Sequence, residues 1–373
     1  MKYTKVLTIL LITGSVSLYA QSPEVVEKYN EGVTAAKAKD YPTAIAAYSE
    51  ALAIDPLYAQ GYYSRGIAKM SQKEYKAAAV DFRKAIKLDG ENAKAHYYSG
   101  YCLMSFGQNE EAIKAFSRGL NYDPSLTKVY YYRAKIQMLE ENYDKAIVDF
   151  QEAIAKDKPT AKVYYQLGVC YLKTEQKDLA DQSFGLALKK DETYAPALTE
   201  RMKLKYKMGD YATVAELASH IISQDATNEK ALYYNALSLM KTESYDEAYT
   251  AFDALLAVDG GNTTALKNKA NISIKNKNYE AAVADYSALI EVENKPNNYF
   301  NRALSYMRLE NWEKAMGDLS QVLKMDAEHA EAYYNRSNVY LQLKDNDNAC
   351  ADMRKAGELG YKDAINYIIS ICG

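Results

Sequence analysis

The sequence predicts an all-α solenoid, a linear array of ten stacked helix pairs. Aromatic residues recur at a spacing of 34, as at Tyr41, Tyr75 and Tyr143. A small residue follows three positions later and a bulky one seven positions later, as in Ala44 and Tyr48. Each period also contains two stretches with apolar residues at helical spacing. Self-similarity at this period is typical of stacked repeats, whose members usually bind partners rather than transform substrates.

Residues 1–20 differ from the repeats and have the features of a secretory signal peptide. Lys2 and Lys5 give a positive start, an apolar run follows, and cleavage is predicted between Ala20 and Gln21. An uncleaved anchor is the competing interpretation, but the apolar run is shorter than the roughly 20 residues of a membrane helix. We therefore expect export, to a periplasmic or outer-membrane-associated location, with no membrane span in the mature chain.

Composition excludes several kinds of partner. Charged residues make up 25% of the chain, and the formal net charge is -3. The sequence therefore has neither the basic footprint that nucleic acid requires nor a polybasic membrane patch.

Export changes how the four cysteines are interpreted, because it implies an oxidising compartment. Cys102 and Cys170 occupy equivalent places two repeats apart, beyond the reach of a disulfide, so they are predicted to be buried packing residues. Cys350 lies in the last repeat and Cys372 at the end of the tail. A disulfide between them would tie down the tail, and at this point it stays an alternative to two free thiols.

Each repeat unit is predicted to be a pair of helices. In one unit, residues 59–71 and 75–88 form the two helices, with a turn between them, and Asp89-Gly90 ends the second. Residues 361–372 form one more amphipathic helix, expected to cap the exposed end of the stack. Counted from Val25, the solenoid of residues 21–373 has units that begin at residues 25, 59, 93, 127, 161, 195, 229, 263, 296 and 330.

Small residues at the eighth place of the units explain how the two helices meet. Gly32, Gly66, Gly100 and Gly168 stand there, although glycine inside a helix costs about 1 kcal/mol relative to alanine. Close approach of the partner helix, with a large aromatic side chain filling the adjacent space, explains their use.

This helix pair, with Gly or Ala early, Ala midway, an aromatic residue next and Asp-Pro at the end, resembles the tetratricopeptide repeat. The resemblance covers residues 25–363. It implies a right-handed superhelix of antiparallel helix pairs with a concave groove lined by the first helices.

A second regularity links the two helices of a unit. In five units a basic residue at the seventh place goes with Asp at the twenty-third place. Units with Glu, Ser, Leu or Asn at the seventh place lack that Asp. We expect ion pairs with a structural role. The predicted pairs are Arg65–Asp81, Arg133–Asp149, Lys269–Asp285, Arg302–Asp318 and Arg336–Asp352.

The sixth unit departs from the pattern. Met202, Val214 and Ile221 are large where other units have small residues, and Ala218 is small where others have Phe. Volume exchanged between facing sites preserves packing. We expect a local change of superhelix curvature near residues 195–228.

Catalysis finds little support in the sequence. His96, His220 and His329 stand in different repeats, and none has a nearby His or Cys with metal-ligand spacing. No Gly-rich phosphate loop is present. We therefore predict a protein that is not an enzyme and that has no metal or other cofactor.

Tyrosine, with 36 copies, gives the best functional indication. The fifth place, which in the family faces the groove, is almost always aromatic, and exposed lysines are expected at its border. Packing between helices is the alternative role for these rings, and the sequence leaves both open. The predicted groove residues are Tyr29, Tyr63, Tyr97, Tyr131, Tyr165, Tyr233, Phe300 and Tyr334, bordered by Lys94, Lys128 and Lys162.

The function that these features favour is a non-catalytic interaction scaffold of the cell envelope, which binds a protein or peptide segment in its groove. The alternative is a glycan-binding module whose tyrosines stack on sugar rings, for example of a cell-wall polymer. Peptide binding predicts that groove lysines change the salt dependence of affinity, whereas glycan binding does not.

Overall fold

A computed structural model describes residues 21–364, and within them it has 20 α-helices and no β-strand. The predicted all-α class of paired helices is therefore confirmed. The first helices of the pairs are α1 (Pro23–Lys37), α3 (Ala59–Ser71), α5 (Ala93–Ser105), α7 (Thr127–Leu139), α9 (Ala161–Lys173), α11 (Ala195–Met208), α13 (Glu229–Lys241), α15 (Thr263–Lys275), α17 (Pro296–Arg308) and α19 (Ala330–Gln342).

The second helices follow the 34-residue spacing in the same way. They are α2 (Tyr41–Ile54), α4 (Tyr75–Leu88), α6 (Asn109–Tyr122), α8 (Tyr143–Lys156), α10 (Lys177–Lys190), α12 (Tyr211–Gln224), α14 (Tyr245–Val258), α16 (Tyr279–Val292), α18 (Trp312–Met325) and α20 (Asn346–Glu358).

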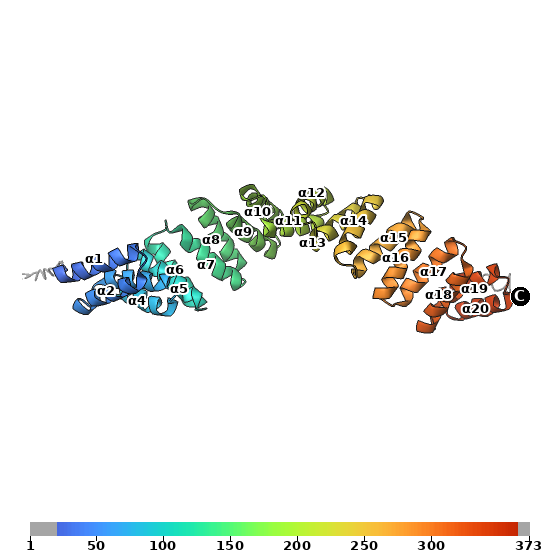
Figure 1. The fold of residues 1–373 in the computed structure, drawn as a ribbon, viewed down its shortest axis with the longest axis horizontal. Coiled ribbons are helices and arrows are strands. Elements are labelled where there is room, and N and C mark those ends of the chain that lie inside the picture. Colours follow the sequence, from blue (N-terminus) through green and yellow to red (C-terminus); the bar gives the residue numbers. More distant parts are fainter. Residues whose placement is uncertain (1–20, 365–373) are drawn as a thin grey trace, which may run out of the picture. The chain divides into compact units, whose positions relative to one another are not determined.

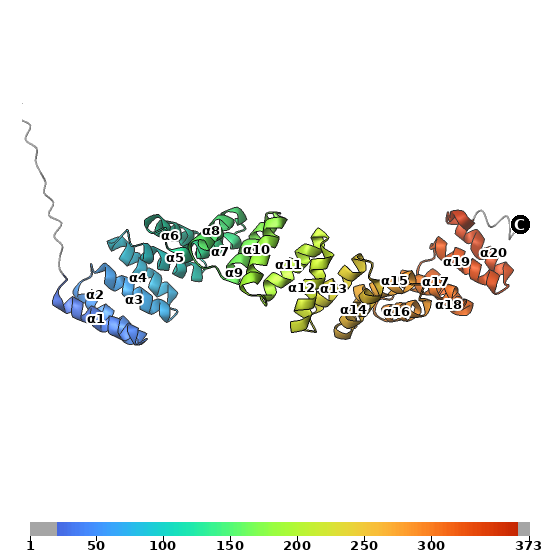
Figure 2. The same cartoon turned by 90° about the horizontal axis from the view of Figure 1, so that it is seen from above.

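The chain divides into two compact units, Met1–Ala180 and Asp181–Gly373. Within the N-terminal unit, α1 packs on α2 and α3 on α4, and each second helix also packs on the first helix of the following pair. The C-terminal unit repeats this order from α11 to α20. The helices of a pair lie side by side in both views (Figures 1 and 2). The core of each unit is therefore a continuous series of small clusters between neighbouring helices, as expected for a repeat array.

Aspartates end most of the second helices and start the turn to the next pair. The side-chain Oδ1 of Asp55 accepts a hydrogen bond from the backbone N–H of Leu57 at 2.8 Å, and Asp123 accepts one from Ser125 at 2.9 Å. Such local bonds favour a turn over further helix. The following first helix can begin with its own cap, as where Asn92 accepts a bond from the N–H of Ala95.

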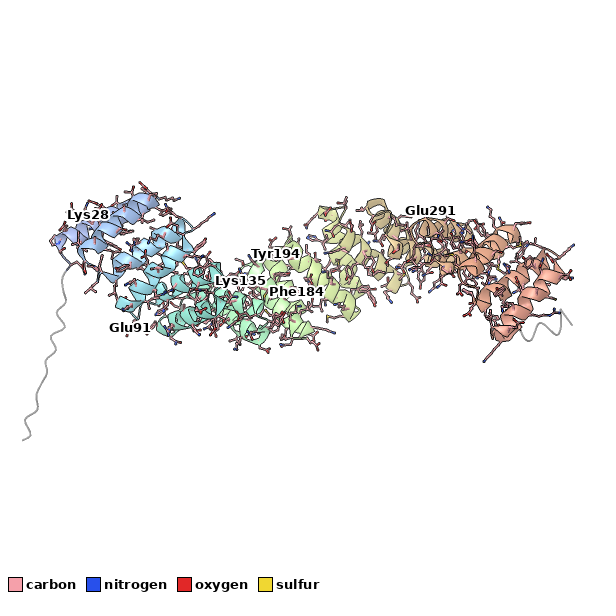
Figure 3. All side chains as sticks on the ribbon, turned by 90° about the horizontal axis from the view of Figure 1, so that it is seen from below. Lys28, Glu91, Lys135, Phe184, Tyr194 and Glu291 are labelled. Carbon is pink, nitrogen blue, oxygen red and sulfur yellow. The ribbon has the colours of Figure 1, made fainter. Side chains whose placement is uncertain are left out.

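The predicted contact between glycine and an aromatic ring is present. A Cβ atom added to Gly32 would lie 2.6 Å from the ring of Tyr48, and one added to Gly100 would lie 2.7 Å from Phe116. The ring thus occupies the space that a side chain on the glycine would need. The equivalent Phe184 on α10 is fully buried, whereas Glu91, in the loop before α5, is exposed (Figure 3).

The sixth pair exchanges volume between these two places, as predicted. Met202 on α11 is fully buried, and it packs in one cluster with Val214 and Ala218 of α12. The large side chain has moved to the first helix and the small one to the second. The change of curvature expected from this exchange stays a prediction.

All five predicted ion pairs are present. Arg133 contacts Asp149 at 2.7 Å, and Lys269 contacts Asp285 at 3.2 Å. The other three distances are 2.8 Å for Arg65–Asp81, 2.8 Å for Arg302–Asp318 and 2.7 Å for Arg336–Asp352.

Each of the four arginines also bonds to the preceding pair, a contact the sequence analysis did not anticipate. The Nη1 of Arg133 donates to Ser117 on α6 at 2.9 Å. Equivalent serines accept from the other three arginines. Where lysine replaces arginine, at Lys269, the preceding helix offers Asp253 at 2.6 Å instead of serine. The basic residue therefore braces three helices, and we call this arrangement the arginine brace.

The cysteines of the N-terminal unit are packing residues, as predicted. Cys102 and Cys170 are free thiols with no exposed surface, and burial raises the pKa of each to about 12. Such thiols are protonated at neutral pH and poorly nucleophilic.

The described chain ends at the start of the predicted cap. Ala364 is fully buried against Met353 and Ala356, and the ring of Tyr361 lies 4.8 Å from that of Tyr334. The rest of the cap, the predicted Cys350–Cys372 disulfide beyond Cys350, and the signal peptide with Ala20 lie outside the described residues. Within residues 21–364, no helix is both long and apolar enough to span a bilayer.

Candidate functional site

The N-terminal unit has two neighbouring cavities beside α5, α7 and α9. The first, of about 300 Å³, is lined by Lys94, Tyr97 and Lys128, and the second, of about 230 Å³, by Lys128 and Tyr131. Their shared wall is formed by Thr127, Lys128 and Asp157. The structure thus brings together predicted groove residues from two successive pairs, whereas Lys162 and Tyr165 of the next pair line neither cavity. We call Tyr97, Tyr98, Tyr131, Tyr132, Lys94 and Lys128 the aromatic surface.

The rings of the aromatic surface also pack against one another and against the core. The Tyr97 centroid lies 4.6 Å from that of Tyr98 and 6.2 Å from that of Tyr132. Tyr132 in turn stacks on Phe116 of the preceding pair at 6.5 Å, with an interplanar angle of 18°. These rings therefore hold neighbouring pairs together while their remaining surface lines a cavity. Both roles that the sequence left open, packing and lining, are present in the same side chains.

Burial controls the charge of the tyrosines. Burial raises the pKa of Tyr97 well above its ordinary value, and it raises that of Tyr63 to about 12. Both hydroxyls are therefore protonated at neutral pH. They can donate a hydrogen bond but supply no negative charge to the surface.

The three predicted border lysines are solvent-exposed, and two of them, Lys94 and Lys128, line the cavities of the aromatic surface. Lys94, Lys128 and Lys162 each stand at the second position of a first helix, on α5, α7 and α9 respectively. None of them has an ion-pair partner within residues 21–364. Asp157, in the loop between α8 and α9, is the one carboxylate among the described residues that lines the two cavities. The border consequently has net positive charge available to a ligand.

The other predicted groove residues pack against neighbouring side chains of the fold. Tyr29 lies 5.4 Å from Tyr48, and its hydroxyl bonds to Ser64 at 3.0 Å. Tyr63, Tyr165 and Tyr233 are partly buried, and Tyr334 packs on Tyr361.

Phe300 differs from its expected place in the groove. It is only 8% exposed and packs in the cluster of Ala303 and Leu319, with its ring 5.0 Å from that of His329. Phenylalanine lacks a hydroxyl that would need water or a partner, so full burial is favourable.

The C-terminal unit has a cavity of about 550 Å³ that the sequence analysis did not predict. It is lined by residues of the first helices α15, α17 and α19 and by residues of α16 and α18. Asn301 and Asn335, at the sixth place of their pairs, stand where the N-terminal unit has Tyr98 and Tyr132. The change from Tyr to Asn at the sixth place is the sequence feature that could have indicated this cavity. We call this space the asparagine cavity, and its lining residues are Asn271, Ile274, Tyr279, Tyr286, Asn301, Leu304, Met307, Arg308, Trp312 and Asn335.

The described residues form no candidate metal centre. Between residues 21 and 364, no group of three or more His, Cys, Asp or Glu side chains could hold a metal ion. His96 is buried, stacks on Tyr122 at 5.7 Å and bonds through Nε2 to the carbonyl of Gly90, which fits a packing role.

Comparison with known families identifies the repeat. Models described as tetratricopeptide repeats match most of the chain. The matched residues are 36–73, 69–136, 161–194, 233–299 and 300–359. No curated protein matches the chain.

Several solved structures are similar to this chain, and the first of those named here shows the same fold. The C-terminal part of a TPR repeat-containing protein from Cytophaga hutchinsonii is 19% identical with a TM-score of 0.51, and the alignment covers 63% of this chain and 97% of that one. The MamA protein is 24% identical with a TM-score of 0.44, covering 46% and 94%. The pilF protein of Pseudomonas aeruginosa is 18% identical with a TM-score of 0.46, covering 57% and 97%.

Proposed function

Because this chain belongs to the tetratricopeptide-repeat family, whose members generally act as scaffolds for protein–protein interaction, we propose that it binds an extended segment of a partner protein along the aromatic surface of its N-terminal unit. The observation that carries the proposal is the convergence of Lys94, Tyr97 and Lys128 on one cavity, with Tyr131 on the next. Aromatic rings supply contact area at low entropic cost, and the unpaired lysines supply a charge to be matched.

The chemistry of this surface favours a segment with both acidic and apolar side chains. Lys94, Lys128 and Lys162 recur once per repeat, so an extended chain lying across the pairs would meet one ammonium group after another. The cavities between them are small and lined by rings, which suits apolar side chains. The tyrosine hydroxyls, held protonated by burial, can donate to backbone carbonyls of the segment.

The proposed place of action is the cell envelope, on the basis of the predicted signal peptide. Export would remove residues 1–20 and leave Gln21 at the amino terminus. The mass of the protein purified from cells would show this directly. A mass that includes residues 1–20 would contradict cleavage.

A charge-reversal pair tests the binding surface without disturbing the packed rings. Lys94→Glu with Lys128→Glu changes two exposed side chains at the border, and residues 21–373 serve as bait for envelope extract. Lys76→Glu with Lys145→Glu is the matched control, because these lysines are also exposed but lie on the second helices α4 and α8.

The expected result is a partner that the wild type and the control capture and the border variant loses. Affinity for a peptide from that partner should fall as ionic strength rises, and the border variant should abolish this dependence. Equal capture by the border variant and the control would contradict the proposed surface, provided that all three proteins melt alike.

A further inference from the structure

The asparagine cavity has the size and composition of a small-ligand site that is separate from the aromatic surface. Its volume of about 550 Å³ falls within the range of about 300–1,000 Å³ that such sites occupy. Leu304, Met307 and Trp312 form apolar wall, and three asparagines together with Arg308 bring polar groups to the same space. An apolar cavity with a few convergent polar groups is the usual form of a ligand-binding site.

Counting partners within residues 21–364, several of these polar groups have unused hydrogen-bonding capacity. The hydroxyl of Tyr286 donates to Oδ1 of Asn271 at 3.2 Å, which leaves the Asn271 amide N–H groups free. The Nδ2 of Asn335 donates to the carbonyl of Glu331 at 2.8 Å, which leaves its Oδ1 free. Within residues 21–364, the side-chain amide of Asn301 has no hydrogen-bond partner. The cavity thus offers carboxamide donors and acceptors that only a ligand or water can satisfy.

The charge of the lining selects the sign of the ligand. Among residues 21–364, Arg308 is the only charged residue that lines the cavity, and it has no ion-pair partner there. No carboxylate from this part of the chain stands in the lining. A free guanidinium binds a carboxylate through two parallel hydrogen bonds, so the cavity favours an anion that carries this group.

We propose that the asparagine cavity binds an acidic saccharide, such as a uronic acid unit of a glycan. A side-chain carboxamide places a donor and an acceptor side by side, which matches the adjacent hydroxyl groups of a sugar ring. The apolar C–H face of the ring would lie on Trp312 or Leu304, and the sugar carboxylate would pair with Arg308. A peptide carboxylate would use Arg308 as well, and its adjacent amide would match one carboxamide, whereas a sugar ring carries enough hydroxyl groups to match all three asparagines.

Trp312 makes the proposal directly testable, because it is the only tryptophan of the chain and it lines the cavity. Its fluorescence, excited at wavelengths where the tyrosines do not absorb, reports on this site. The probes are D-glucuronic acid, D-glucose as the neutral sugar of the same ring, and N-acetylglutamate as the peptide-like carboxylate. We expect a saturable change with glucuronic acid, at least about tenfold weaker binding of glucose, and weaker binding of N-acetylglutamate.

Two variants assign the contacts. Arg308→Gln should reduce the preference for glucuronic acid over glucose, and Asn301→Ala should weaken binding of both sugars. In the described part of the chain, neither side chain has a partner that its loss would leave unsatisfied, so both variants should melt as the wild type does. Ligand-observed NMR gives a second readout that does not depend on Trp312.

The outcomes separate this site from the aromatic surface. Lys94→Glu with Lys128→Glu should leave the sugar response unchanged, whatever its effect on partner capture. The proposal is overturned if glucuronic acid gives no saturable response by either method. It is equally overturned if N-acetylglutamate binds as tightly as glucuronic acid, because the cavity would then be a site for peptide carboxylates.

Discussion

The two units use the same repeat to build different surfaces. At the sixth place, the N-terminal unit has Tyr98 and Tyr132, whose rings stack on the phenylalanines of the preceding pairs. The C-terminal unit has Asn301 and Asn335 at that place, and a cavity of about 550 Å³ opens there instead of ones of about 300 and 230 Å³. In these four pairs, tyrosine at the sixth place fills the space between first helices with rings, whereas asparagine lines a cavity there.

Both units have the same supporting frame of paired helices, which the arginine brace ties together. Of the changes to this frame, loss of a brace aspartate should have the largest effect. Asp149 is 4% exposed and Arg133 19% exposed on their side chains. Asp149→Ala would leave a largely buried guanidinium unpaired, so the free energy of unfolding should fall by about 3 kcal/mol, the lower end of the range for such losses. Urea unfolding of the variant measures this.

The double variant Arg133→Leu with Asp149→Leu is the control, because it removes both charges together. It should cost less than Asp149→Ala alone. Asp318→Ala should have an effect similar to that of Asp149→Ala if the frame is the same in the C-terminal unit. A wild-type unfolding curve for Asp149→Ala would show that the brace does not stabilise the array.

Glycines test how tightly the frame is packed. A side chain on Gly100 would collide with Phe116, so Gly100→Leu should destabilise the protein by roughly 1–3 kcal/mol. Gly317, on α18 of the C-terminal unit, has no atom within 4 Å of an added Cβ, so Gly317→Ala should stabilise by up to about 1 kcal/mol. Thermal melting distinguishes the two, and a loss of stability in both would refute the packing argument.

Exchanging the residues at the sixth place tests the comparison itself. Tyr132→Asn removes a ring that stacks on Phe116, so we expect a loss of roughly 1–2 kcal/mol. Asn301→Tyr should place a ring towards Tyr286, which lines the asparagine cavity, and abolish the sugar response of Trp312 without destabilising the fold. A full sugar response in Asn301→Tyr would show that this place does not control the cavity.

The smallest expected effect is a difference between the wild type and Tyr63→Phe in how the free energy of unfolding responds to alkaline pH. Burial raises the pKa of Tyr63 to about 12, against about 10 for an exposed tyrosine. Between these pH values the folded state keeps a proton that the unfolded state releases, so the free energy of unfolding should fall as pH rises from about 10 to 12. Tyr63→Phe removes the titrating group, so its stability should fall less over the same interval in urea titrations. Parallel curves for the two proteins would show that Tyr63 does not titrate differently in the folded state.

Much of the fold could be predicted because its determinants repeat within 34 residues. Gly100 and Phe116 are 16 residues apart, as are Arg133 and Asp149, so the sequence alone showed which residues face each other within a pair. A residue pattern that recurs in successive repeats can be recognised from a single sequence. The exchange of Met202 and Ala218 was visible for the same reason, as a departure from that regularity.

Only the tertiary structure decided how successive pairs meet. The bond from Arg133 to Ser117 joins neighbouring pairs, and the ring of Phe300 lies 5.0 Å from that of His329 at the start of the next pair. The asparagine cavity forms because side chains from α15, α17 and α19 converge, and the sequence pattern of a single repeat does not reveal that convergence. Stacking sets the distances between successive helix pairs, and those distances depend on the summed volumes of many side chains rather than on any one residue type.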